Sequence, residues 1–159
     1  MWMLLACTCG DVPEAPLGHY ASALLARDAL IRGDLEGVQD AARQLDQGGT
    51  SDSGASELGG AVGMAVAASD TEEAGWAVAG MITACAECHD GKTGPTSASP
   101  GPHGLDALWA DLVSGRPIDA SGVTAVAPTE GTALTLASGH SEKAEAYVAL
   151  VARCSSCHP

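Results

Sequence analysis

The sequence predicts an all-α protein built from two small helical bundles in tandem. Along most of the chain, apolar residues recur at helical spacing between short helix-start and helix-stop signals. Residues 91–102 are rich in Gly, Pro and Ser, which is the composition of a linker. The segments before and after this linker end in similar sequences at a constant offset of 69 residues. We therefore expect a tether over residues 1–16, one helical unit over 17–90 and a second over 103–159.

Four helices are expected in the first unit. Gly33 stops the first helix, and Asp34 caps the second. A loop over residues 48–54 follows, and the third helix is rich in Ala and Gly. The sequence Asp-Thr-Glu-Glu at residues 70–73 offers a capping box for the fourth helix. The expected helices cover residues 17–32, 35–47 and 56–68, and from about 71 to the cysteine motif at 85–89.

The second unit is expected to be a shorter version of the first. Its helices should cover residues 105–114, begin again near 129, and begin a last time near 141, with a weak segment over 118–127. Gly115-Arg116-Pro117 breaks the first of these helices. In the last helix, Tyr147, Leu150, Val151 and Cys154 fall at i, i+3, i+4 and i+7 and form one stripe.

The N-terminal residues 1–7, MWMLLAC, are similar to the end of a bacterial lipoprotein signal, in which the cysteine is lipidated. Cys7 is therefore the expected lipidation site, and a lipid there would be the protein's link to a membrane. Six residues before Cys7 are too few for a whole signal, so we expect the true start codon upstream. The alternative is that these residues are the frayed start of a soluble chain. Cys9 remains without a role in either case.

The other four cysteines belong to two C-x-x-C-H motifs, CAECH at residues 85–89 and CSSCH at 154–158. This is the attachment motif of c-type haem. On a helix, two thiols at i and i+3 reach the vinyl groups of one porphyrin, and the next histidine turns to the iron from the same side. The expected iron ligands are His89 and His158. The expected attachment cysteines are Cys85, Cys88, Cys154 and Cys157.

Two other uses of these cysteines are less consistent with the sequence. A structural zinc site could use two C-x-x-C pairs, but 65 residues separate Cys88 from Cys154, and a four-cysteine site does not need the histidines. A thioredoxin-like motif expects a strand before its helix, whereas both motifs here end helical segments. The sequence therefore favours two covalently bound haem c groups.

Each unit also offers a second iron ligand. A four-helix bundle in up-down-up-down order brings the start of its first helix beside the end of its last. His19 and His103 stand near those starts, so they could bind the irons held by His89 and His158 from the opposite side. The alternative is that both are solvated surface residues.

Three further side chains are less suited as iron ligands. Met64 competes with His19 for the distal position, and would need the third helix to face the iron. Met81 lies one turn before Cys85 and is expected in the core. His140 lies in the turn before the last helix, and is expected to be exposed to solvent.

Charge and composition narrow the range of functions. The net charge is −13, and residues 1–90 contain 14 acidic and 3 basic side chains, which excludes a nucleic-acid binder. This negative charge favours redox partners with a basic docking surface. The alternative is that the charge only keeps the protein soluble. There is no Phe in the chain, and two porphyrins would supply the apolar bulk that aromatic side chains usually provide.

Haem motifs on the last helix of a small bundle resemble those of class II cytochromes c, the group that includes cytochrome c prime. Residues 26–36, ARDALIRGDLE, resemble the start of small bacterial di-haem c-type cytochromes. This resemblance implies an electron carrier, and not an enzyme, in the periplasm or outer cell envelope. The alternative is a gas-binding or sensing cytochrome with a five-coordinate haem. That reading requires His103 not to bind iron, and Leu105, Leu108 and Trp109 would then line the open face.

Overall fold

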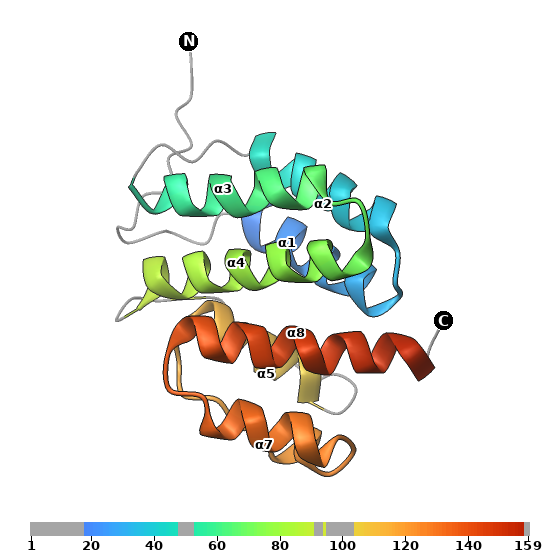
Figure 1. Ribbon diagram of the computed structural model, residues 1–159. Coiled ribbons are helices and arrows are strands. Elements are labelled where there is room, and N and C mark those ends of the chain that lie inside the picture. The colour runs from blue at the N-terminus through green and yellow to red at the C-terminus, as the bar shows by residue number, and fades with distance from the viewer. Residues whose placement is uncertain (1–17, 48–52, 91–93, 95–103, 158–159) are drawn as a thin grey trace.

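The computed structural model describes residues 18–47, 53–90, 94 and 104–157, and every regular element within them is a helix. The predicted all-α class is therefore confirmed. Figure 1 shows α3 and α4 side by side, with α8 below α4 and α7 beneath α8. The helices are α1 (Gly18–Ile31), α2 (Leu35–Gln47), α3 (Ser53–Ala67), α4 (Thr71–His89), α5 (Leu105–Val113), α6 (Ser121–Thr124), α7 (Pro128–Leu136) and α8 (His140–Cys157).

The eight helices share one hydrophobic core. Helices α1 to α4 pack as neighbouring pairs, α8 packs along α4, and α5 contacts both of these helices. Small residues dominate the first half of this core, whereas Trp109, Tyr147 and Leu150 fill the second half. The segments on the two sides of the expected linker therefore lie against each other. None of the described helices is both long and apolar enough to span a membrane.

The turn between α1 and α2 follows the expected signals. Gly33 has a φ of 66°, in the left-handed region that glycine adopts without strain. The Asp34 side chain accepts a hydrogen bond of 2.9 Å from the backbone N–H of Gly37, as a helix N-cap does. In contrast, α3 begins at Ser53, inside the segment that was expected to be a loop.

The 69-residue offset is visible in the bonding before α4 and α8. The Asp70 side chain caps α4 by accepting from the Glu73 N–H, as predicted. The returning bond differs from the expected capping box, because the Glu73 carboxylate accepts from the N–H and hydroxyl of Ser69, one residue before the cap. Glu142 accepts the same two bonds from Ser138 before α8. The two Ser–Glu pairs lie 69 residues apart, so α4 and α8 begin with the same pattern of hydrogen bonds.

The second half departs from the expected ranges in two details. The weak segment over 118–127 contains the single turn α6, and α7 begins at Pro128, where proline suits a first helical turn. The predicted stripe of α8 is buried as far as it is described, since Tyr147, Leu150 and Val151 are each at most 1% exposed. Within this stripe, the Tyr147 ring packs against Trp109 of α5.

Candidate functional site

The end of α4 meets the start of α1 through two histidines. His19 lies in the first turn of α1 and His89 is the last residue of α4. Their ring centroids are 6.2 Å apart and their planes differ by only 10°. Two imidazoles that bind one metal ion from opposite sides, each through a nitrogen at about 2 Å, have centroids roughly 6 Å apart. The two rings are stacked, at a separation close to the one that a shared ion would require.

The surroundings of His19 favour uncharged imidazole. Burial lowers the pKa of His19, and the charge of His89 lowers it further. Neutral imidazole is the form that binds metals, because the ligating nitrogen must be free of its proton. Both rings are half-buried, and they lie where the bundle ends rather than in its centre.

The described part of the first motif lies on the same stretch of helix. Cys85 and Cys88 are half-buried in the last turns of α4, one turn apart and next to His89. Their spacing suits attachment of one porphyrin through two thioethers. Cys88 is disulfide-bonded in this structure. Thioether formation would require this thiol to be free.

The second motif lies at the other end of the molecule. Cys154 and Cys157 fall in the last turn of α8, but their side chains, together with His158, His103 and Cys7, lie outside the described residues. Helix α8 begins beside the end of α4, because Nε2 of His140 lies 3.9 Å from the Asp90 carboxylate. At a rise of about 1.5 Å per residue, Cys154 lies about 21 Å further along the axis.

The other three candidate iron ligands lie in different environments. Met81 is 1% exposed and belongs to the core, as expected. Met64 is 55% exposed and lines a groove on the outer face of α3 and α4. The prediction for His140 is wrong. Its side chain is only 26% exposed, because the antiparallel packing of α8 on α4 brings it against the end of α4.

A buried polar cluster was missed by the sequence reasoning. Arg27 is 5% exposed and its guanidinium carbon lies 5.7 Å from the centroid of the Trp109 ring. The Trp109 and Tyr147 rings are 5.7 Å apart, and burial raises the pKa of Tyr147. An arginine within the apolar segment ALLARDALI is the signal that could have indicated this cluster.

The donor set of the site fits haem better than a bare ion. Among the described side chains, no group of three or more His, Cys, Asp or Glu gathers where it could hold a metal. A bis-histidine haem needs only two protein ligands, because the porphyrin supplies the other four nitrogens. Comparison with protein families, with curated proteins and with solved structures gives no significant match.

Proposed function

We propose that this protein is a di-haem c-type cytochrome that carries electrons between redox proteins in the bacterial cell envelope. The observation that supports this most is the approach of His19 to His89, at a centroid distance of 6.2 Å, beside a C-x-x-C-H motif. Two helices far apart in sequence bring these imidazoles together. A pair of cysteines with another role, such as a disulfide, would not require His19 beside His89.

In this proposal Cys85 and Cys88 hold the first haem, and His89 and His19 bind its iron. By the 69-residue repeat, Cys154, Cys157 and His158 do the same for the second haem. His103 is the proposed opposite ligand because it stands, like His19, near the start of the first helix of its segment. The similar bonds of Glu73 and Glu142 at the starts of the two motif helices support this equivalence. Bound haem supplies one-electron redox chemistry at the iron.

The chain's own residues then favour electron transfer over catalysis. Imidazole on both sides leaves no open position for a substrate, and Ala86, in the same helix turn as His89, is 1% exposed. Thioethers keep the cofactor bound outside the reducing cytoplasm. We therefore propose an envelope location, with Cys7 as the lipid-anchored residue.

The optical spectrum of the matured protein tests this function. Oxidised, reduced, and reduced samples under carbon monoxide should be compared, with the haem content measured by a pyridine haemochrome assay. We expect two low-spin c-type haems that do not bind carbon monoxide. Absence of covalent haem would overturn the proposal, and rapid binding of carbon monoxide at one haem would favour the gas-binding alternative.

A further inference from the structure

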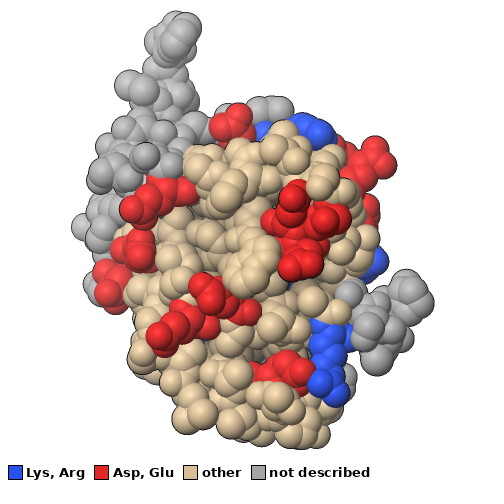
Figure 2. Space-filling view, in the orientation of Figure 1, with Lys and Arg blue, Asp and Glu red and all other residues tan. Residues whose placement is uncertain are grey.

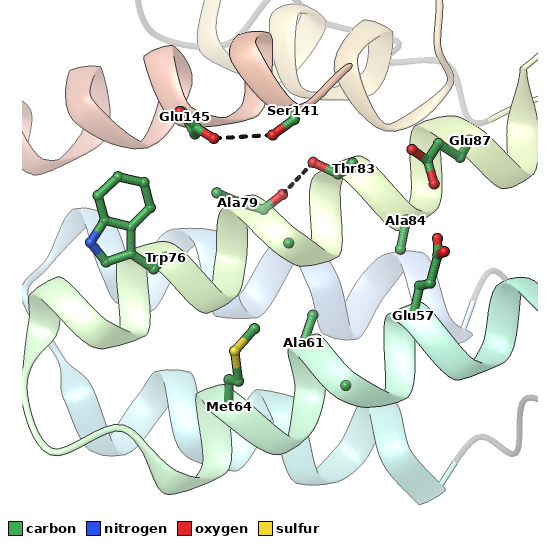
Figure 3. A pocket seen from close by; sticks show the side chains of 12 residues that line it. Glu57, Ala61, Met64, Trp76, Ala79, Thr83, Ala84, Glu87, Ser141 and Glu145 are labelled. Atoms are coloured by element: carbon green, nitrogen blue, oxygen red, sulfur yellow. Dashed lines mark hydrogen bonds between the residues drawn. The ribbon is translucent and has the colours of Figure 1, made fainter. Parts of the chain in front are cut away.

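A groove of about 720 Å³ runs along the outer face of α3 and α4, beside the start of α8. Its floor is made of residues with little or no side chain, including Gly60, Ala61, Ala79 and Gly80. Met64 and Trp76 stand at one end of the groove and Glu57 and Glu87 at the other (Figure 3). Neither His19 nor His89 is among the residues that line this groove.

The apolar end of the groove is open to solvent. Trp76 is 56% exposed and Met64 is 55% exposed, and both are large side chains that a monomer usually buries. Exposed tryptophan beside a concave apolar floor is typical of the centre of a protein interface, where a few such residues supply most of the binding energy. The small floor residues leave room for a side chain of a partner.

The rest of the groove is acidic. Glu57, Glu87 and Glu145 line it from three helices, and no Lys or Arg is among its lining residues. On the face seen in Figure 2, acidic side chains surround an uncharged area, and basic side chains lie towards the margins. The groove therefore combines an apolar floor with uncompensated negative charge.

Two occupants from this chain itself do not match that charge. Residues 1–17 contain Asp11 and Glu14 but no Lys or Arg, so they would add negative charge to the groove. A second copy would present the same acidic face, and its net charge is also −13. A basic surface is complementary, because Lys or Arg would pair with the glutamates while apolar side chains contact Trp76.

We propose that this groove is the docking site for the basic, apolar-centred face of a partner redox protein. Its acidic end reaches the first haem motif, since Glu87 lies between Cys85 and Cys88. A partner seated there would lie within one helical turn of the attachment cysteines. The electron-transfer part of this inference rests on the proposed function, whereas the docking itself does not.

Binding is tested with a small basic c-type cytochrome as the probe, by calorimetry at low and high salt. The variant Glu57→Gln/Glu87→Gln should lose about tenfold in affinity, and Trp76→Ser a similar factor. The matched control Glu36→Gln/Asp46→Asn removes the same charge from exposed positions on α2, and Leu136→Ser removes an exposed apolar residue from α7. The charge control should change the affinity less than about threefold, because charges outside the interface act only at long range. Leu136→Ser should also change it less than about threefold, because Leu136 does not line the groove.

Three results would overturn the docking site. They are equal losses in the groove and control variants, no binding of the probe at low salt, and a dimer in analytical ultracentrifugation that Trp76→Ser dissociates. Carbodiimide cross-links from probe lysines should fall on Glu57, Glu87 or Glu145. Haem content is measured on the same samples, so failure of the haem proposal would be seen separately from failure of docking.

Discussion

Nη2 of Arg27 in α1 lies 2.8 Å from Oδ1 of Asp106 in α5. Arg27 also pairs with Asp28, and its side chain is only 6% exposed, whereas the two carboxylates are 37% and 38% exposed. The bridge joins the first four helices to the segment that follows the expected linker. The relative positions of the helices that carry the two C-x-x-C-H motifs therefore depend in part on one buried charge.

Replacing Arg27 with alanine should destabilise the fold strongly. Loss of one partner of a buried pair leaves the other charges uncompensated, and we expect a cost of about 2–3 kcal/mol, because both carboxylates keep some contact with water. The control is Arg43→Ala, which removes an exposed pair with Asp40 and should cost less than about 1 kcal/mol. Urea unfolding followed by circular dichroism measures both values. Equal costs would show that burial of Arg27 does not matter.

The helices of the first half could be predicted because their signals are local. Gly33, Asp34 and Asp70 each act within four residues of their own position, and the structure places α1, α2 and α4 within one or two residues of the expected ranges. The bridge from Arg27 to Asp106 could not be predicted in this way. It joins residues 79 positions apart, and only the packing of α1 near α5 brings them together.

The contact between α4 and α8 leaves little room for a large side chain at Gly75. A Cβ on Gly75 would lie 3.0 Å from Cγ1 of Val148, which is tighter than most Cβ contacts, and a leucine would add three further carbons there. Gly75→Leu should therefore force the two helices apart and cost about 2 kcal/mol or more.

Gly63 is the matched control for this change, because a Cβ there meets nothing within 4 Å. Gly63→Leu should stabilise α3 by about 0.5–1 kcal/mol, since leucine has a higher helix propensity than glycine. Thermal unfolding measures both variants. A stabilising Gly75→Leu would contradict the observed approach of α4 to α8.

Stability should depend on pH through Glu142. The backbone N–H of Ser138 is the main cause that holds the pKa of Glu142 below its ordinary value of 4.5, and the Ser138 hydroxyl and the Gly139 N–H add to it. A folded-state pKa below the unfolded one means that this contribution is present above pH 4.5. It is then lost as the pH falls through the lowered value.

The wild type should therefore exceed Glu142→Gln in thermal midpoint at neutral pH, and the difference should shrink as the pH falls below 4.5. Glu36→Gln is the control, because Glu36 is exposed at the start of α2 and its side chain has no hydrogen bond to any described residue. A difference between wild type and Glu142→Gln that stayed constant from neutral pH to pH 3 would exclude this role for the carboxylate.

The proximity of His19 and His89 was expected from topology, because consecutive antiparallel helices bring the first start beside the last end. The position of His140 was misjudged for a related reason. Helix α8 was treated as part of a separate unit, whereas it packs antiparallel along α4 and places His140 beside Asp90. The groove over α3 and α4 could not be predicted either, since it depends on which small residues of the two helices remain uncovered.

Removal of the distal imidazole is the sharpest test of the proposed iron ligands. In His19→Ala, one of the two haems should lose its sixth ligand, bind carbon monoxide, and return to the low-spin spectrum when imidazole is added to the solution. His140→Ala is the control, because His140 is also a half-buried histidine near the end of α4 but faces Asp90. It should leave both haems low-spin. If His19→Ala also leaves both haems low-spin and closed to carbon monoxide, His19 is not an iron ligand, and its approach to His89 serves only the packing of α1 on α4.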